Sequence, residues 1–248
     1  MNLTSIEAVS RTDKGLVREV NEDCLALFPE VGLVILADGM GGYNAGEVAS
    51  QLATETVAAQ LLADCHTGLG IAKERMKASV MAANRVLVDS AEQIPEWQGM
   101  GTTLLLGYFH KGRITYAHVG DSRLYRYRAG RLERLTQDHT LIQRLLDDGI
   151  FDSYQEGKAA GVNTSALLQG VGIGDELKVD VVEAAVEEGD LFLFCSDGLS
   201  NMVPDTLIET TISATNGVIK EAADALLSLA LENGGVDNIS LVLARPEN

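Results

Sequence analysis

The order of hydrophobic patterns along the chain limits its fold more than any other feature. Short apolar runs typical of strands lie at 23–28 and 33–37, and long amphipathic patterns typical of helices follow at 47–65 and 71–90. Strands followed by paired helices and then by many strands predict an α+β fold with separate layers, rather than an alternating βαβ fold. Later strands are predicted at 102–109, 114–119, 123–128, 131–135, 177–184, 191–195 and 239–244, and later helices at 141–147 and 220–233.

The chain shows no internal division. No linker rich in proline or serine, no low-complexity tract and no repeat interrupts its 248 residues, and a hydrophobic content of 46% is enough for a large core. We therefore expect one domain over residues 1–248. A polar, glycine-containing stretch at 148–165 predicts a mobile surface loop.

Charge and cysteine content narrow the possible partners and compartments. The net charge of −17 repels nucleic-acid backbones and anionic lipid surfaces, so neither is expected as a partner. The acidity fits either general solubility or a gathering of carboxylates around metal ions. Cys24, Cys65 and Cys195 are far apart, and no run of about 18 apolar residues occurs, which predicts a soluble cytoplasmic protein without a membrane segment.

Four aspartates stand at strand ends, three of them beside glycine. Asp38 and Asp197 precede a glycine, Asp121 follows one, and Asp237 comes directly before the last strand. One such aspartate is usually only part of a turn, but four together favour a shared function. Hard divalent cations take several oxygen ligands, and a glycine beside a ligand lets a backbone carbonyl approach the metal. The four histidines lack zinc-site spacing, so the pattern predicts Mg²⁺ or Mn²⁺; they are His66, His110, His118 and His139.

Seven short segments then carry a family resemblance, each weakly specific alone and highly specific in this order. They are Gly15 to Asp23, Asp38 to Gly42, Gly99 to Thr103, Val119 to Arg123, Thr136 to His139, Ser196 to Leu199, and Asp237 to Ser240. In these segments the chain resembles the metal-dependent protein phosphatases of the type 2C class, in particular the compact bacterial serine/threonine phosphatases. The resemblance covers about residues 12–243.

The resemblance implies the metal ligands. Asp38, Asp197 and Asp237 match the carboxylates of a binuclear Mg²⁺ or Mn²⁺ centre, and the carbonyl of Gly39 matches its backbone ligand. Asp121 matches an extra ligand of a third, weaker metal site in bacterial members.

It also implies the groups around the metals. Arg18 matches the guanidinium that grips the substrate phosphate, a task suited to a planar, always-charged donor, although Arg18 alone would be taken for a surface charge. Glu22 matches an outer acid that orders metal-bound water, and Asn238 matches a residue that supports the loop of Asp237.

The fold and reaction follow from the same resemblance. It implies a four-layer α-β-β-α sandwich of two antiparallel sheets, with the metals in a cleft at one edge. Two metal ions about 4 Å apart would activate a water that attacks the phosphorus of phosphoserine or phosphothreonine, without a phosphoenzyme. No cysteine has the arginine spacing of a cysteine-based phosphatase. The implied partners are phosphorylated proteins, including a serine/threonine kinase, and the expected state is a monomer.

Some positions depart from the family pattern. Met40 replaces a histidine proposed as general acid in many eukaryotic relatives, so another group must protonate the leaving oxygen, and we assign this to a third metal at Asp121. Tyr43 replaces a common bacterial histidine and is interpreted as a rim aromatic, and the segment 167–172 lacks the usual arginine. The arginine-rich hairpin at 123–134 is interpreted as a solvated outer face, not a recognition strip.

Two other functional classes remain open. One is an inactive relative that binds phosphoproteins or a kinase, which the presence of all three aspartates of the binuclear centre disfavours. The other is a phosphoesterase for small molecules, which would differ mainly in the loop at 148–165 and the surrounding surface.

Overall fold

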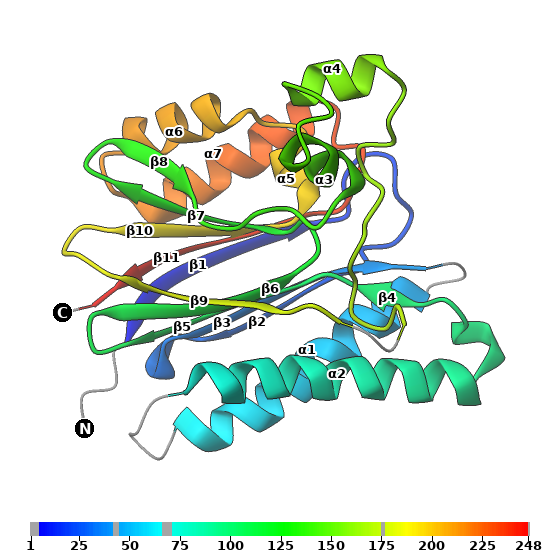
Figure 1. Ribbon diagram of the computed structural model, residues 1–248. Helices are drawn as coiled ribbons and strands as arrows, with labels where there is room; N and C mark the ends of the chain where they lie inside the picture. The colour runs from blue at the N-terminus through cyan, green and yellow to red at the C-terminus, as the bar shows by residue number, and fades with distance from the viewer. Residues whose placement is uncertain (1–4, 42–44, 66–70, 175–176, 248) are drawn as a thin grey trace.

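The protein is a layered sandwich. The computed structural model describes residues 5–41, 45–65, 71–174 and 177–247, so the predictions on Tyr43 and His66 fall outside the described residues. Two antiparallel sheets lie face to face, and helices cover the outer face of each sheet, which gives four layers (Figure 1). This arrangement confirms the α-β-β-α sandwich expected from the sequence.

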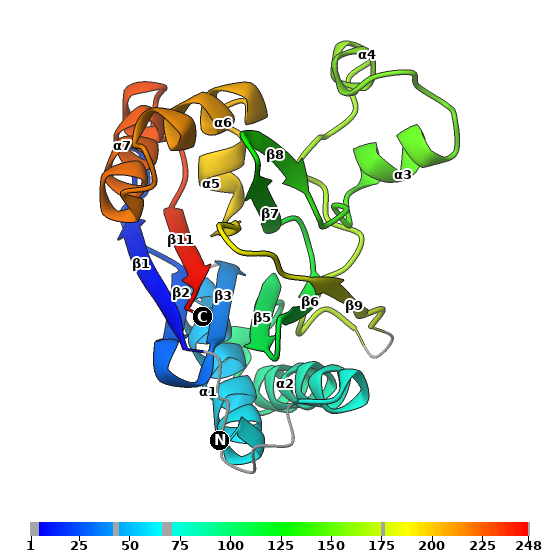
Figure 2. The same ribbon diagram turned by 90° about the vertical axis from the view of Figure 1, so that its left-hand side faces the viewer.

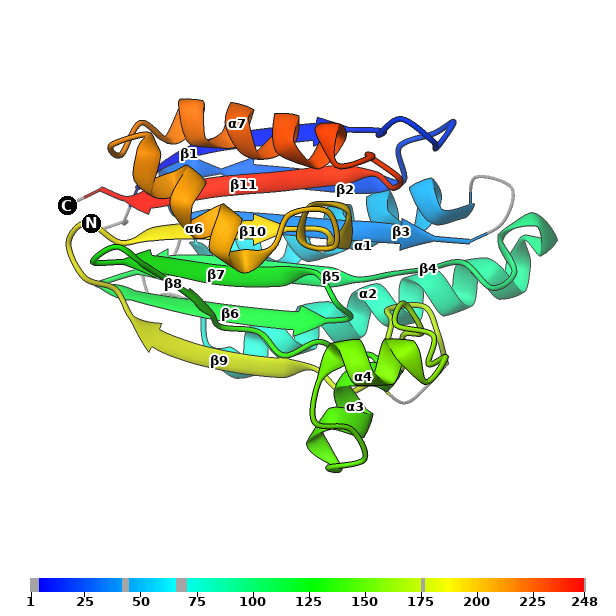
Figure 3. The same ribbon diagram turned by 90° about the horizontal axis from the view of Figure 1, so that it is seen from above.

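The first sheet has the strand order β1-β11-β10-β7-β8. Every residue of its central strand β10 is buried, as expected for a continuous apolar run that is covered on both faces. Helices α6 and α7 cover its outer side (Figures 2 and 3). The bounds are β1 (Ile6–Asp13), β11 (Ile239–Pro246), β10 (Leu191–Cys195), β7 (Arg123–Arg128), β8 (Arg131–Arg134), α6 (Asp205–Ala214) and α7 (Ile219–Glu232).

The second sheet has the strand order β2-β3-β5-β6-β9, with the short strand β4 paired to the end of β3. Helices α1 and α2 cover its outer face (Figure 1). The bounds are β2 (Asp23–Phe28), β3 (Leu33–Met40), β4 (Gly101–Thr102), β5 (Leu104–His110), β6 (Arg113–Val119), β9 (Asp180–Ala185), α1 (Ala45–Cys65) and α2 (Lys73–Gln93). Short helical turns are η1 (Pro29–Val31), η2 (Pro95–Trp97) and α5 (Asp197–Ser200).

Apolar side chains from both sheets fill the space between them. Phe109 of β5 meets Phe192 of β10 edge to face, with ring centroids 5.1 Å apart, an arrangement that aromatic quadrupoles favour. Gly107 of β5 lies against the ring of Phe194, and a Cβ there would come within 2.5 Å of the ring. The absence of a side chain at Gly107 therefore lets the two sheets approach each other at this point.

The sequence patterns missed β1 and α6. β1 mixes apolar, acidic and basic residues, and its place is fixed by pairing with β11 from Ile6 to Asp13. α6 is rich in β-branched residues, which have low helix propensity, but Ile208 and Ile212 are buried against the first sheet. Tertiary contacts therefore determine the secondary structure of both segments.

The loop prediction for 148–165 is wrong over part of its length, because α4 (Tyr154–Ala159) lies inside it, next to α3 (Leu141–Asp147). Ser153 begins α4 by accepting the backbone N–H of Glu156 at 3.2 Å, and the Glu156 carboxylate accepts the N–H of Asp152 at 2.8 Å. This serine-to-glutamate spacing resembles a capping box, and the sequence analysis overlooked it.

The interpretation of the arginine-rich hairpin also needs correction. Arg123 binds the half-buried Asp138 with a closest distance of 2.7 Å, and Arg128 binds the fully buried Asp190 at 2.6 Å. These guanidinium groups are half-buried and paired rather than freely solvated. The reason is that the loops after β8 and before β10 bring carboxylates within ion-pair distance of these guanidinium groups.

None of the helices in the described part of the chain combines the length and apolar character that crossing a bilayer requires.

We predict that Gly107→Ala lowers the free energy of unfolding by about 1–3 kcal/mol, because the new Cβ overlaps the buried ring of Phe194. Chemical denaturation of the purified variants measures this. A Gly107→Ala/Phe194→Leu double variant should lose less than the sum of the two single changes, because leucine removes the atoms in conflict. Additive losses would contradict the close approach of the sheets at this point.

Candidate metal centre

The predicted site residues meet in one cavity. Its volume is about 200 Å³, and it opens where strand ends of both sheets come together. Asp38 lies near the end of β3, Asp121 follows β6, and Asp197 follows β10. All seven predicted metal and catalytic positions line this cavity: Arg18, Glu22, Asp38, Gly39, Asp121, Asp197 and Asp237.

Asp38 is held by its backbone. Its N–H donates to Thr103 Oγ1 at 3.0 Å, and its carbonyl accepts the N–H of Thr103 at 2.9 Å and the hydroxyl of Thr102 at 2.9 Å. On the other side of the strand it pairs with Asp23 of β2. The Asp38 side chain therefore projects from a backbone with little freedom, although neither threonine was singled out from the sequence.

Glu22 and Gly39 meet at the start of α1. The N–H of Gly39 donates to the carbonyl of Glu22 at 3.1 Å, and a Cβ at Gly39 would lie 2.1 Å from the carbonyl oxygen of Gly46. The Glu22 carboxylate lies against Gly46, near the helix N-terminus, where a negative charge is favoured, and a Cβ at Gly46 would come within 2.4 Å of Glu22 Oε1. Burial raises the pKa of Glu22, and the nearby Arg18 charge opposes this rise.

Asn238 organises the loop that carries Asp237. Its backbone N–H donates to Asp237 Oδ1 at 2.9 Å, and its side-chain oxygen accepts the N–H of Glu22 at 2.8 Å. Its side-chain nitrogen donates to the carbonyls of Lys14 at 3.0 Å and Val20 at 2.9 Å. One buried amide therefore fixes the Asp237 loop against the segment that contains Arg18 and Glu22.

Arg18 points across the cavity opening. Its Nη2 donates to Asp237 Oδ2 at 2.7 Å, and its side chain is 48% exposed. One guanidinium edge is therefore oriented by a carboxylate, while much of the group can still reach a ligand from solvent.

Asp197 begins the short helix α5. Asn201 donates its side-chain N–H to Asp197 Oδ2 at 3.0 Å. The next residue, Gly198, packs against β11 so closely that a Cβ would lie 2.0 Å from the carbonyl oxygen of Asn238. The glycine is thus needed to bring the Asp197 and Asp237 loops together.

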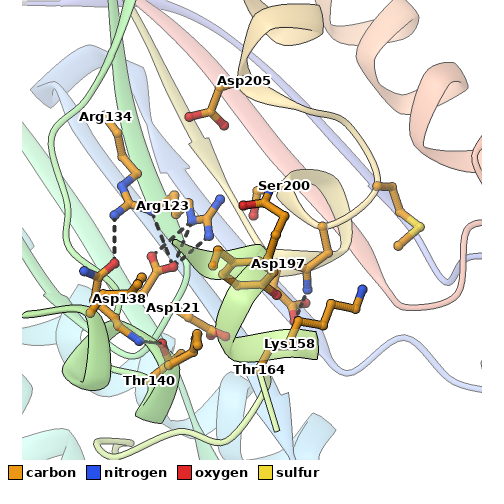
Figure 4. Close-up of a pocket in the computed structure, with 17 residues that line it drawn as sticks. Asp121, Arg123, Arg134, Asp138, Thr140, Lys158, Thr164, Asp197, Ser200 and Asp205 are labelled. Atoms are coloured by element: carbon orange, nitrogen blue, oxygen red, sulfur yellow. Dashed lines mark hydrogen bonds and ion pairs between the residues drawn. The ribbon is translucent and has the colours of Figure 1, made fainter. Parts of the chain in front are cut away.

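Asp121 and Asp197 also line a second, larger hollow of about 580 Å³. Residues of α3 and α4 form one side of it, and residues of α5 and the start of α6 form the other. Figure 4 shows Arg123 facing Asp138 within this hollow, with Lys158 and Asp205 at other parts of its wall. The small acidic cavity therefore shares two of its aspartates with a roomier polar one.

The carboxylates repel one another. Desolvation, reinforced by neighbouring aspartates, raises the pKa of Asp38 well above its usual range. The same two causes raise the pKa of Asp121 to about 7 and that of Asp197 to about 6. Of the described residues that line the smaller cavity, only Arg18 carries a positive charge. The site thus holds more negative charge than its own residues neutralise.

Asp23 is a functional candidate that the residue-by-residue reasoning passed over. Its Oδ2 accepts the hydroxyl of Ser196 at 2.9 Å, and its Oδ1 is buried without a partner. Burial is the main cause that raises its pKa to about 7, with Asp197 and Asp237 adding repulsion. The sequence signal was a charged residue at the first position of an apolar strand.

Relatives of known structure share this fold. The crystal structure of the Mycobacterium tuberculosis serine/threonine phosphatase PstP/Ppp superposes with a TM-score of 0.88 at 36% identity, covering 98% of this chain and 99% of that one. The catalytic domain of PstP in complex with two manganese ions gives a TM-score of 0.86 at 35% identity, covering 98% and 99% of the two chains.

The relatives found by sequence are named serine/threonine phosphatases, as are the relatives of known structure. PstP of M. tuberculosis strain H37Rv is 37% identical over 235 residues, which are 95% of this chain but 44% of PstP, so the chain spans less than half of that relative. The serine/threonine phosphatase stp of Listeria welshimeri is 35% identical over 247 residues, covering 96% of this chain and 95% of stp. The family model for protein phosphatase 2C matches residues 17–232. With this match over most of its length, the chain belongs to the protein phosphatase 2C family.

Proposed function

We propose that this chain is a metal-dependent protein phosphatase that hydrolyses phosphoserine and phosphothreonine. The observation that carries the proposal is the meeting of Arg18 and four aspartates in one cavity at the ends of strands from both sheets. Relatives named serine/threonine phosphatases support it, because they align along nearly the whole of this chain.

The residues fit hard divalent cations. The candidate donors are all oxygens, which Mg²⁺ and Mn²⁺ prefer, and the raised pKa values of Asp38 and Asp197 follow from desolvation and repulsion that a cation would offset. We assign Asp38, the carbonyl of Gly39, Asp197 and Asp237 to two tight metal sites. Asp121, together with Asp197, is assigned to a third and weaker one.

The chain's own groups have distinct tasks in this mechanism. When bound, the cations would supply Lewis acidity and an activated water. Arg18, oriented by Asp237, binds the phosphoryl oxygens with its exposed guanidinium edge. Glu22, whose carboxylate lies against Gly46 at the start of α1, would accept hydrogen bonds that orient the attacking water. Met40 lines the same cavity but has no proton to donate. We therefore assign the protonation of the leaving oxygen to the proposed third site, which Asp121 would form.

The larger hollow supports a macromolecular substrate. Its volume of about 580 Å³ and its polar walls offer room beside Asp121 and Asp197 for the chain that flanks a phosphorylated residue. A phosphoesterase for small molecules would have less use for this space. We further propose that the chain forms one catalytic domain, acts as a cytoplasmic monomer, and opposes a serine/threonine kinase whose phosphorylated form is among its substrates.

Metal dependence is the first test. With Mn²⁺ or Mg²⁺ present, the protein should release phosphate from phosphothreonine peptides, and excess chelator should abolish the release. Asp38→Asn and Asp197→Asn should each lower kcat/KM by at least about a hundredfold, because each removes a charged ligand.

A matched control is Asp89→Asn, which removes the same charge from an exposed position on α2 and should keep full activity. Full activity in chelator, or in either cavity variant, would overturn the assignment. Activity on small phosphate esters with none on peptides would instead favour the phosphoesterase.

Arg18→Ala should raise KM for a phosphopeptide and lower kcat/KM by about ten- to a hundredfold, as expected for the loss of a charged hydrogen-bond donor. Calorimetry with Mn²⁺ should show little change in metal affinity. Arg113→Ala, at the end of β6 away from Asp121, breaks an exposed ion pair with Glu183 and serves as the control. Equal kinetics for the two variants would mean that Arg18 is only a surface charge.

The metal-free protein should lose stability as pH rises. The folded-state pKa is about 7 for Asp23 and Asp121 and about 6 for Asp197, above the unfolded value of about 3.9. Between pH 4 and 7 the folded state therefore binds more protons than the unfolded state, so stability present at low pH is lost on the way up. In chelator, Tm should be lower at pH 7.5 than at pH 5.

Added Mn²⁺ should raise Tm more at pH 7.5 than at pH 5, because metal competes with protons for the same oxygens. Asp197→Asn should flatten the pH dependence in chelator, whereas Asp89→Asn should leave it unchanged. A metal-free Tm that rises with pH over this range would contradict the placement of these carboxylates.

A further inference from the structure

His139 lies outside the cavity but is bound directly to the peptide that precedes Asp121. The backbone N–H of His139 donates to the carbonyl of Gly120 at 2.9 Å. The backbone N–H of Gly120 returns a hydrogen bond to Nδ1 of His139 at 3.3 Å. Both polar groups of Gly120 are therefore held by one residue, which comes from the loop between β8 and α3.

The hydrogen bonds of His139 are consistent with a single neutral tautomer. Nε2 lies 3.3 Å from Asp180 Oδ2, which can only accept when ionised, so the proton belongs on Nε2. Nδ1 then has a free lone pair, as the bond from Gly120 requires. Lys178 holds the other oxygen of Asp180 at 3.3 Å, and the His139 side chain is only 9% exposed. Asp180, which is itself paired with Lys178, thus orients the imidazole through Nε2.

Gly120 is confined on its other side by Thr103. Its φ of +103° is a conformation that favours glycine, and a Cβ would lie 2.6 Å from Thr103 Cγ2. Thr103 also accepts the N–H of Asp38 and shares a 2.7 Å hydrogen bond with Ser122. The turn that carries Asp121 therefore lies between Thr103, bound to the main centre, and His139.

A metal-binding role for this histidine is disfavoured. His118, His139 and Asp180 each offer a possible ligand atom, and these atoms lie within 4.8 Å of one another. Both nitrogens of His139, however, already have partners of the right polarity. Nδ1 of the buried His118 lacks a partner, but the two rings lie against each other, tilted by 30° with centroids 4.6 Å apart, which favours packing.

We propose that His139 is a positioning residue for Asp121, holding the Gly120 peptide so that the Asp121 carboxylate faces the cavity. This inference rests on the proposed phosphatase function for its kinetic consequence, but the hydrogen bond itself does not. Asp180 holds the imidazole in place by binding Nε2, and Lys178 holds Asp180. The role needs a hydrogen-bond acceptor at the position of Nδ1.

Two substitutions of His139 separate positioning from packing. In His139→Asn, the side-chain oxygen takes the place of Nδ1 and can accept the N–H of Gly120. In His139→Gln, the amide reaches the place of Nε2 and leaves that N–H without its acceptor. Both remove the ring that packs against His118, so both should lower Tm by a similar amount.

The first readout does not involve catalysis. Amide hydrogen exchange at Gly120, measured by NMR, should be about tenfold faster in His139→Gln than in His139→Asn, as expected for the loss of one hydrogen bond. Equal exchange in the two variants would overturn the proposed contact, whether or not the protein is a phosphatase.

The second readout is the ratio of phosphopeptide to aryl phosphate turnover in Mn²⁺. His139→Gln should lower kcat on the phosphopeptide about tenfold and change aryl phosphate turnover little. We expect the same pattern for Asp121→Ala, because an aryl phosphate has a good leaving group that needs little protonation. His139→Asn should stay within about twofold of wild type. The Asp121→Ala/His139→Gln double variant should be no worse than Asp121→Ala alone.

Other outcomes would overturn the inference. Equal loss of activity in both His139 variants, or additive losses in the double variant, would leave His139 a packing residue. Intense visible absorption by added Co²⁺ that persists in Asp38→Asn but is lost in His139→Asn and in His139→Gln would make it a metal ligand. A wild-type protein that is folded but inactive on every phosphate ester would refute the proposed function and leave the exchange measurement to decide the contact.

Discussion

Mutual repulsion among carboxylates is the constraint on which the rest of the structure depends. Asp38, Asp121, Asp197 and Asp237 come from four separate segments, and burial together with mutual repulsion raises the pKa of Asp38, Asp121 and Asp197 instead of stabilising the apo fold. Burying charge without a partner is costly, so the sandwich must supply the free energy that holds them together. The apolar layers between and outside the sheets have the size to do so.

The register of the strand pairs determines where the polar side chains of the site lie. β2 pairs with β3 so that Asp23 stands opposite Asp38, and the side chain of Ser196 joins Asp23 to the other sheet at 2.9 Å. Ser196 also accepts the N–H of Ser240 at 2.9 Å. A slip of one residue in either sheet would turn these polar side chains to the opposite face. The register of the two sheets therefore fixes the positions of the site residues, and the polar contacts at the site in turn hold that register.

The sequence predicted those parts of the fold that depend on local pattern. β10 and α3 have the bounds that their apolar runs indicated, and the four aspartates were recognisable at strand ends because glycines and apolar strands flank them. β1 and α6 were missed because their residues lack a clear period and take their structure from tertiary contacts. Asp23 and Thr103 were missed because their importance lies in partners far along the chain.

The supports of the aspartates differ, and this difference bears on how tightly each site can hold a cation. Asp38 lies within a paired strand, and Asp197 and Asp237 are fixed to each other through Gly198 and the buried Asn238. Asp121 instead follows a glycine turn that lies between Thr103 and a loop, and both backbone hydrogen bonds of Gly120 come from that loop, through His139. A ligand on such a turn has more freedom to lose on binding a cation, and that lost entropy opposes binding. For the proposed third site at Asp121, this architecture therefore favours weak and exchangeable occupancy, next to the more rigid proposed pair of sites.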